Sequence, residues 1–353
     1  MTENATILIP DISGYTEFLT KTALVHSSHI INELLDLIVT SNTLDFTLSE
    51  IEGDAVLFYR KGKPIAVDSL IRQCLTMFEN FHKQLKIIER DTVCPCGACQ
   101  TASDLSLKCI VHYGPIKEIK VSRFTKVAGL DMIIAHRLLK NRIGAPEYIL
   151  TTRNYLNHLS ERELPSMLTW QQASDEYPAL GIIEYYYASL EQLKKAIPDP
   201  PKRESSVIEL GEDSLEIEIN TLLLDVYQKL IDLDSRVQWI PGLEIKERDE
   251  VTERIGQRHV CLSQGTTADI ITVSSDIRDD HITYIEDGRI RGLDIPYRET
   301  YLLKSLKEGK TALTFNVKWL SDLEPPEKFV RQFLDFYKMT LECLKQFCEN
   351  QLL

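Results

Sequence analysis

The apolar positions in the first half of the chain alternate between strand-like runs and helix-like spacing. A short apolar run predicts a buried strand at residues 5–10, and further strands are expected at 44–51, 55–59, 107–112 and 182–187. Apolar residues three and four positions apart predict amphipathic helices at 24–39, 67–88 and 130–139. We expect the strand at 107–112 to end at Gly114-Pro115. The order approximates β-α-β-β-α-β, a ferredoxin-like α+β arrangement of an antiparallel sheet with helices on one face.

The second half has a different order of elements. One strand at 215–219 and one helix at 222–233 precede strands at 243–248, 259–263, 269–274, 281–286, 298–304 and 311–319. Turns are expected at Asp287-Gly288 and Glu308-Gly309. A final helix at 327–350 follows Pro325-Pro326 and carries an apolar stripe that needs a partner surface. We therefore expect an antiparallel sheet crossed by one long helix.

A proline-rich seam separates these two halves. Residues 197–206 hold three prolines among charged residues and serines, so this segment cannot continue a helix or a central strand. We expect a first domain at 1–196, a linker at 197–206 and a second domain at 207–353. The length of 353 residues also favours two domains.

Composition and charge exclude several classes of function. The chain has 40 basic and 53 acidic residues, and its net charge of −13 argues against nucleic-acid binding. No apolar run reaches the ~18 residues of a membrane span, and the N-terminus lacks the basic region of a secretory signal. Eight cysteines in such a chain predict reduced thiols and a cytoplasmic protein. Residues 1–205 hold 22 basic and 25 acidic residues, a net of −3, which leaves −10 for the second half.

Two aspartates in the first half form the most informative pair. Asp11 ends the first expected strand, and Asp54 lies in the tight turn between the next two. Those strands are neighbours in a β-α-β-β fold, so the two carboxylates can hold a hard divalent cation such as Mg²⁺. The segment Ser13-Gly14-Tyr15-Thr16 then turns into a helix whose free backbone N–H groups suit phosphate oxygens. The alternative is that both aspartates only terminate a strand and a turn, where this residue is common.

Five segments resemble, in order, the motifs of class III nucleotidyl cyclases: DISGYT, EIEGDAVLF, CIVHYGPI, AGLDMIIAHRLLKN and YPALGIIEYYYASL. The resemblance covers most of residues 5–193. It implies a homodimeric cyclase-type domain that binds Mg²⁺ or Mn²⁺ on Asp11, Asp54 and the backbone of Ile12. It also implies attack of a ribose 3′-hydroxyl on the α-phosphorus of a purine nucleoside triphosphate, with release of pyrophosphate. Arg137 falls where the family has an arginine that stabilises the transition state.

Two features depart from the family's pattern. Ile133 replaces an asparagine, and isoleucine cannot orient a ribose by hydrogen bonding. The base-reading positions hold Glu50 and Lys126, which exchange the charges of the adenine-reading pair and favour GTP over ATP. The alternative is that these two side chains pair with each other and close the pocket. The first domain is therefore either a cyclase or a catalytically degenerate module that binds a nucleotide or a partner.

Three cysteines with C-x-C-x-x-C spacing form an insert at residues 94–99. Cys94, Cys96 and Cys99 fit a Zn²⁺ site. The fourth ligand is left open among Cys109, Cys74, His82 and His112, and a loop of reduced thiols without metal is the alternative. A similar insert occurs in an uncharacterised bacterial family that joins a cyclase-like domain to a START-like one. This chain resembles that family over nearly its whole length.

The layout of the second half resembles the START-like (SRPBCC) helix-grip superfamily, as does the stretch Trp239-Ile240-Pro241-Gly242. The resemblance covers about residues 207–350. It implies a cup that senses an unknown hydrophobic small molecule between the sheet and the long helix. Candidates for the lining are Trp239, His259, Tyr284, Tyr297 and Trp319. The alternative is that these side chains simply fill the core.

Overall fold

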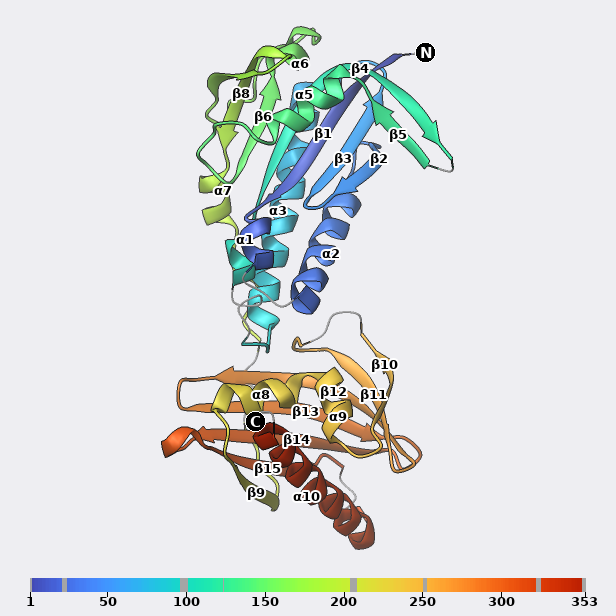
Figure 1. Cartoon of the computed structure of the whole chain (residues 1–353), viewed down its shortest axis with the longest axis vertical. Coiled ribbons are helices and arrows are strands. Elements are labelled where there is room, and N and C mark those ends of the chain that lie inside the picture. Colours follow the sequence, from blue (N-terminus) through green and yellow to red (C-terminus); the bar gives the residue numbers. More distant parts are fainter. Residues whose placement is uncertain are drawn as a thin grey trace. The chain divides into compact units, whose positions relative to one another are not determined.

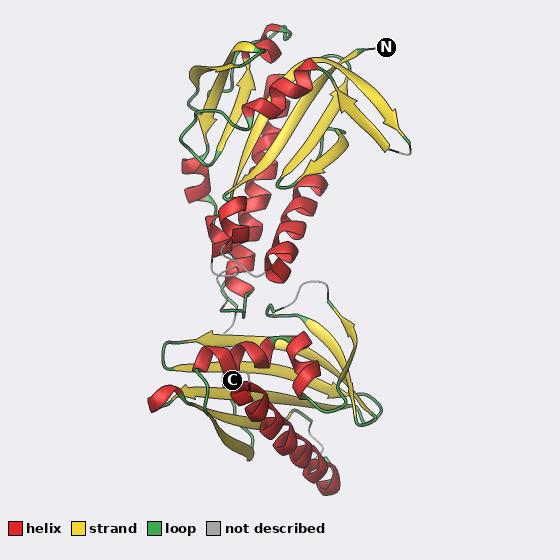
Figure 2. Ribbon diagram, viewed as in Figure 1, coloured by secondary structure: helices red, strands yellow, loops and turns green. Residues whose placement is uncertain are grey.

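The structure is a computed structural model that describes residues 2–20, 24–95, 101–122, 124–203, 208–249, 253–321 and 325–350. The chain divides into two compact units (Figure 1). One unit comprises Met1–Arg90 and Gly97–Pro201, and the other comprises Asp91–Cys96 and Lys202–Leu353. Each unit combines helices with a large sheet (Figure 2), so the expected α+β class is confirmed. Within the described ranges, every helix is too short or too polar to cross a membrane.

The first unit is built on one large sheet. Its strands are β1 (Glu3–Ser13), β2 (Thr47–Glu52), β3 (Ala55–Lys61), β4 (Ser106–Val121), β5 (Phe124–Ala128), β6 (Tyr148–Thr152), β7 (Gln171–Tyr177) and β8 (Gly181–Ser189). Its helices are α1 (Tyr15–Thr20), α2 (Leu24–Thr40), α3 (Val67–Asp91), α5 (Leu130–Leu138), α6 (Arg153–Asn157) and α7 (Glu191–Ala196). The strand order is β2-β3-β1-β4-β6-β8-β7, and β5 pairs with β4. β4 and β6 are parallel, so the expectation of a purely antiparallel sheet is wrong at this pair.

Helices cover both faces of this sheet, whereas the sequence pattern predicted helices on one face. β1 is buried from Ala5 to Ile12, which is why its apolar run is nearly continuous rather than alternating. Ile110 of β4 packs into one core cluster with Met132 of α5. Successive residues of a strand point to opposite faces, and the neighbouring Cys109 is hydrogen-bonded to Cys74 of α3. Figure 1 accordingly shows α5 in front of β1 and α3 behind it.

β4 is much longer than the sequence pattern predicted. It continues through Gly114-Pro115 to Val121 and returns as β5, so the expected end of the strand at this dipeptide is wrong. Glycine was interpreted as a turn former. Here its missing side chain instead makes room for Asp131 of α5, whose Oδ1 lies 2.1 Å from the position that a Cβ of residue 114 would take.

The second unit is an antiparallel sheet with three helices. Its strands are β9 (Asp213–Ile219), β10 (Glu244–Arg248), β11 (Arg258–Ser263), β12 (Thr266–Ile277), β13 (His281–Ile290), β14 (Ile295–Ser305) and β15 (Thr311–Trp319), in the order β10-β11-β12-β13-β14-β15-β9. Its helices are α8 (Leu223–Ile231), α9 (Leu233–Trp239) and α10 (Glu327–Asn350), the last with the bounds expected from the sequence. All three helices lie on the same side of the sheet in Figure 1.

Two local expectations in this unit are wrong. The single helix expected at 222–233 is two helices, because Asp232 has an extended backbone and its side chain accepts a hydrogen bond from the backbone N–H of Asp234 at 3.0 Å. The turn expected at Asp287-Gly288 lies inside β13. Gly288 stands opposite Tyr297 of β14, and the tyrosine ring occupies the space where a side chain of residue 288 would lie.

The short segment Asp91–Cys96 belongs to the second unit although it directly follows the body of α3. The carbonyl of Asp91 accepts the N–H of Ile255 at 2.8 Å, and the N–H of Val93 donates to the carbonyl of Glu253 at 2.9 Å. The hydroxyl of Tyr227 on α8 also donates to the carbonyl of Val93 at 2.8 Å. The second unit is therefore built from two separate segments of the chain, Asp91–Cys96 and Lys202–Leu353. The proline-rich segment at residues 197–206 lies at the start of the second segment only.

Gly288→Ala is expected to destabilise the second unit by about 1–3 kcal/mol, the usual cost of overpacking. The reason is that a Cβ at residue 288 would lie 2.2 Å from Cζ of Tyr297. The measurement is the free energy of unfolding in urea. Gly144→Ala is the matched control, because nothing lies within 4 Å of its Cβ position. Equal unfolding free energies for the two variants would contradict this close packing.

Candidate functional site

The two aspartates of the first unit lie together at the end of β1. Asp11 pairs in register with Ala55, the first residue of β3, and Asp54 directly precedes that residue. The N–H of Ile12 donates to the carbonyl of Asp54 at 3.1 Å, which fixes the turn against β1. Burial, and next the charge of Asp11, raise the pKa of Asp54 to about 6. The structure thus brings the two carboxylates within electrostatic reach of each other.

Lys108, which the sequence analysis missed, is the cation beside this pair. It stands opposite Asp11 on β4, and its Nζ lies 2.9 Å from Oδ2 of Asp11. Its ammonium also donates to the carbonyl of Leu139 at 3.3 Å. Both charged side chains are largely buried, so each needs an opposite charge nearby. The carboxylates are hard oxygen donors that fit Mg²⁺ or Mn²⁺, and such an ion would compete with Lys108 for Asp11.

The segment predicted to contact phosphate forms the corner between β1 and α1. Ser13 ends β1, and Tyr15 and Thr16 begin α1, which has six residues. Gly14 between them has a φ of 89°, a left-handed conformation that favours glycine. Its carbonyl accepts the N–H of Phe18 at 2.9 Å. This corner follows Asp11 within a few residues.

Glu50 and Lys126 form an ion pair of 3.0 Å. The side-chain hydrogen bond to Glu50 and the charge of Glu50 raise the pKa of Lys126. Glu52 lies 3.8 Å from Lys126 and 3.7 Å from Nδ1 of His136 on α5. The pairing that the sequence analysis kept as an alternative is therefore present. The side chains of Glu50, Glu52 and His136 also place three ligand atoms close enough to share a cation.

α5 presents two of the predicted positions to solvent. Ile133 is 51% exposed, and Arg137, four residues later on the same face, is also exposed. Arg137 forms no ion pair with any residue that the structure describes. The buried Asp131 anchors the helix, since its Oδ1 lies 2.9 Å from Nε2 of His112 on β4. The guanidinium of Arg137 is thus left available to a group outside the first unit's own fold.

The predicted zinc ligands are only partly covered by the structure. Cys96 and Cys99 lie outside the described residues. Cys94 is buried in the second unit, and Cys109 is buried in the first. A hydrogen bond with Cys74, and next burial, raise the pKa of Cys109. No group of metal-ligating side chains within the described ranges contains a cysteine, so the zinc site stays a prediction.

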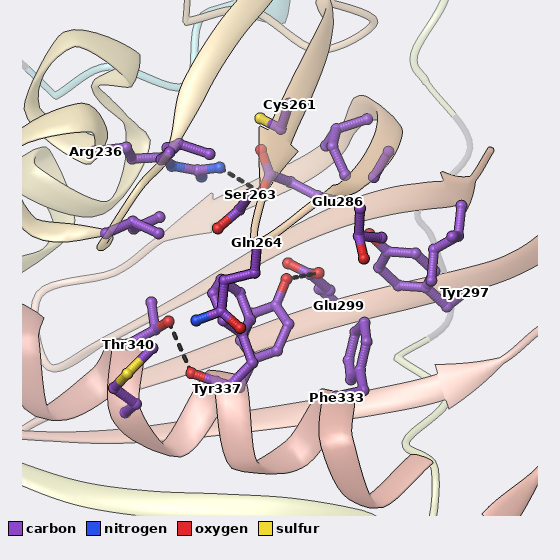
Figure 3. Close-up of a pocket in the computed structure, with 18 of the residues that line it drawn as sticks. Arg236, Cys261, Ser263, Gln264, Glu286, Tyr297, Glu299, Phe333, Tyr337 and Thr340 are labelled. Atoms are coloured by element: carbon purple, nitrogen blue, oxygen red, sulfur yellow. Dashed lines mark hydrogen bonds and ion pairs between the residues drawn. The ribbon is translucent and has the colours of Figure 1, made fainter. Parts of the chain in front are cut away.

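The second unit contains a cavity of about 620 Å³ between its sheet and α10 (Figure 3). Of the predicted lining residues, Trp239, His259 and Tyr297 line this cavity, whereas Tyr284 and Trp319 do not. Tyr284 is buried and donates a hydrogen bond to Glu286 at 2.8 Å. Trp319 packs against Phe333 with ring centroids 5.1 Å apart. Tyr284 therefore belongs to the core, whereas Trp319 is only partly buried.

One wall of the cavity is charged, which the sequence analysis also missed. Glu286 of β13 and Glu299 of β14 stand directly opposite each other, and both are buried (Figure 3). Burial acts to raise the pKa of Glu286. Arg236 of α9, 2.9 Å away, acts together with His259 and the hydroxyl of Tyr284 to hold this pKa below its ordinary value. Burial and the charge of Glu286 raise the pKa of Glu299 to about 7. The hydroxyls of Tyr301 and Tyr337 donate to Glu299.

In a comparison with protein families, the family described as "Protein of unknown function (DUF2652)" matches residues 31–148 of this chain. One curated relative is the uncharacterized protein Rv2561/Rv2562 of Mycobacterium tuberculosis. It is 31% identical to this chain over 156 residues, which are 43% of this chain and 71% of the relative. The chain belongs to the family of this mycobacterial protein.

Comparison with solved structures gives weak similarity to cyclases. A bacterial light-regulated adenylyl cyclase has a TM-score of 0.42 and 15% identity, with 56% of each chain covered. The catalytic core of a rhodopsin-guanylyl cyclase with converted specificity, in complex with ATPαS, has a TM-score of 0.39 and 16% identity. This match covers 53% of this chain and 96% of that one. The hypothetical protein jhp0584 from Helicobacter pylori has a TM-score of 0.32 and 11% identity, with 38% and 86% covered.

Glu299→Gln is expected to change stability in a pH-dependent way. The pKa of Glu299 is about 7 in the folded chain against an ordinary 4.5, so the folded chain keeps this proton to higher pH than the unfolded chain does. The stabilisation from the protonated carboxyl is complete below about pH 4.5 and is lost as pH rises through about 7. Glutamine does not titrate. As pH rises over this range, the free energy of unfolding of the variant relative to the wild type should therefore increase by at most about 3 kcal/mol.

Urea unfolding of the wild type and Glu299→Gln at about pH 5 and about pH 8 measures this difference. Glu308→Gln, at an exposed position, is the control for removal of an acidic group. A stability difference between wild type and Glu299→Gln that is the same at both pH values would contradict the raised pKa.

Proposed function

We propose that the first unit is a class III cyclase-like module that binds a purine nucleoside triphosphate, with GTP favoured over ATP. It converts this nucleotide to the 3′,5′-cyclic monophosphate and pyrophosphate. The observation that carries the proposal is the convergence of Asp11 and Asp54 beside the corner at residues 13–16. A half-buried carboxylate that is repelled by its neighbour is stabilised by a cation, and hard oxygen donors suit Mg²⁺ or Mn²⁺.

The ligands of the cation are assigned from the end of β1. Asp11, Asp54 and the backbone carbonyl of Ile12 would hold it. When bound, such an ion lowers the pKa of the attacking ribose hydroxyl and neutralises negative charge on the triphosphate. The backbone N–H groups of residues 13–16 would orient the phosphate oxygens, because the left-handed Gly14 turns the chain sharply at this point.

Base recognition and charge stabilisation fall to three further side chains. Once the ion pair between Glu50 and Lys126 opens, Glu50 can accept from N1 and N2 of guanine and Lys126 can donate to O6. Arg137, which has no ion pair within the described residues, would stabilise negative charge on the phosphoryl oxygens. The exposed position of Arg137 on α5 favours its acting on a nucleotide held by a second copy of the chain.

A homodimer is supported by apolar side chains around the Glu50–Lys126 pair. Ile51 lies next to Glu50 in β2, and Ile119 stands opposite Lys126 where β4 pairs with β5. Ile133 lies one helical turn before His136 on α5. These three side chains are 44–51% exposed. A second copy that covers this face would bury them and complete the site.

Lys108 and Ile133 favour a second candidate function, nucleotide or partner binding without turnover. Lys108 already supplies a positive charge to Asp11 at 2.9 Å. Ile133 is solvent-exposed and offers no hydrogen bond to a ribose. In this candidate the first unit would bind the nucleotide tightly, and this binding would be coupled to ligand binding in the second unit.

For the second unit we propose a START-like helix-grip domain that binds a hydrophobic small molecule. The supporting observation is the 620 Å³ cavity between the antiparallel sheet and α10, which is within the usual size of a small-molecule site. Trp239 and Tyr297 supply aromatic surface to this cavity.

Asp54→Asn tests the carboxylate pair. It should lower cyclic nucleotide formation from Mn²⁺·GTP by at least about a hundredfold, because one charged oxygen donor to the cation is lost. Product is measured by chromatography with the purified full chain. Asp45→Asn is the matched control, since Asp45 is exposed and its left-handed φ of 54° suits asparagine. Failure of the wild type to turn over any nucleoside triphosphate would remove the cyclase proposal, and nucleotide binding without turnover would favour the second candidate.

Ile133→Glu tests the dimer. A charge in the proposed interface should weaken self-association by at least about tenfold, as measured by sedimentation equilibrium. Met167→Glu is the control, because Met167 is similarly exposed but lies in the loop between α6 and β7. Unchanged self-association in Ile133→Glu would contradict this interface.

A further inference from the structure

Two side chains in the second unit's cavity have buried nitrogen atoms with no hydrogen-bond partner in the described part of the chain. They are Arg236, at Nη2, and His259, at both ring nitrogens. His259 is 2% and Arg236 is 6% exposed, and both line the cavity. Leaving a buried polar atom unpaired costs about 1–3 kcal/mol, and most such atoms in folded proteins are paired. Because both residues line the cavity, a ligand that enters it could supply the missing partner.

The charge balance of the wall disfavours an anionic head group. Arg236 is the permanently positive side chain among the described lining residues, and it is already 2.9 Å from Glu286. Glu299, whose pKa is about 7, stands opposite Glu286 on the next strand, and the exposed Asp335 of α10 adds a negative charge to the lining. A carboxylate or phosphate would enter a buried cluster that has no unpaired cation to receive it.

The donors and acceptors of the wall define the complementary group. Burial lowers the pKa of His259 to about 4, so its ring is neutral at pH 7 and has one N–H donor and one bare nitrogen acceptor. The guanidinium of Arg236 only donates. One hydroxyl group can accept from Arg236 and donate to the bare ring nitrogen of His259, whereas a ketone can only accept.

We propose that this cavity binds an uncharged lipophile through a hydroxyl group placed against Arg236 and His259. The remaining lining that contacts the apolar body includes Trp239, Ile240, Leu243, Ile270, Phe333 and Leu341. This inference rests on the proposed role of the second unit as a ligand cup. It adds the chemical class of the ligand and separates it from fatty acids and other anions.

Three probes with the same alkyl chain test the proposal: decan-1-ol, decanoate and decane. Each competes with the uncharged dye Nile red for the purified full-length chain, and the fluorescence of the dye reports displacement. We expect decan-1-ol to bind at least about tenfold more tightly than either of the others. If decanoate or decane binds as tightly, the inference of a hydroxyl-bearing ligand is overturned, but the proposal that the cavity binds a hydrophobic molecule still stands. If the dye and all three probes fail to bind, the cup itself is overturned.

Glu286→Gln is expected to weaken the preference of the cavity for an uncharged over an anionic ligand. The substitution keeps an oxygen for the hydroxyl of Tyr284 but removes the negative charge that balances Arg236. The affinity for decanoate should then rise by at least about tenfold, while decane should change little. An unchanged or weaker affinity for decanoate would overturn the assignment of Arg236 to the head group.

His259→Phe removes both ring nitrogens and keeps an aromatic ring of similar size. The advantage of decan-1-ol over decane should fall by at least about tenfold, while decane itself should still bind. Arg258→Gln is the matched control, because this neighbouring side chain is exposed and does not line the cavity. If decan-1-ol keeps its full advantage in His259→Phe, the role of His259 is excluded.

Discussion

In each unit, strand pairing holds two carboxylates close together, and one cation from the same unit lies against the pair. Asp11 and Asp54 meet because β1 pairs with the first residue of β3, and Lys108 reaches Asp11 from β4. Glu286 and Glu299 meet as direct cross-strand neighbours, and Arg236 reaches Glu286 from α9. Like charges placed opposite each other destabilise a sheet, so both arrangements depend on the cation that accompanies them.

The two pairs differ in how firmly their cation is held. Lys108 offers a single ammonium on a flexible chain beside a turn, which is a contact that a divalent ion can replace. Arg236 is buried, and its Nε also donates to the carbonyl of Leu230, which fixes the guanidinium in place. The first pair is therefore suited to exchange of ions. The second pair is suited to a permanent polar wall, in which Arg236 stays paired with Glu286.

The sequence pattern predicted most of the fold. The apolar spacing located α3 and α10 closely, because long amphipathic helices give a strong periodic signal. The pattern failed at two glycines, because a glycine can either form a turn or leave space for another side chain. Gly114 was interpreted as the end of a strand and Gly288 as part of a turn. Both lie within strands, where another side chain fills the space beside them. Such close approaches depend on tertiary packing, which local sequence does not encode.

The site residues divide in the same way. Asp11, Asp54 and the Glu50–Lys126 pair were found because motif order placed them, and the structure brings each pair together. Lys108 was missed because its role depends on the β1–β4 register. A signal for Glu286 and Glu299 did exist. Both are charged residues at alternate, inward positions of predicted strands, where an apolar residue is the ordinary expectation.

These differences in burial also bear on the nucleotide binding proposed for the first unit. The Glu50–Lys126 pair is exposed on the lysine side, so water can replace either partner and opening it costs little. The Asp11–Lys108 pair is largely buried, and removing a partner would leave a charge without compensation. A divalent ion avoids this penalty only by taking the place of Lys108 at Asp11 while also neutralising Asp54. In the proposed function, cation exchange at Asp11 therefore costs more than opening of the Glu50–Lys126 pair and would be the step that controls nucleotide binding.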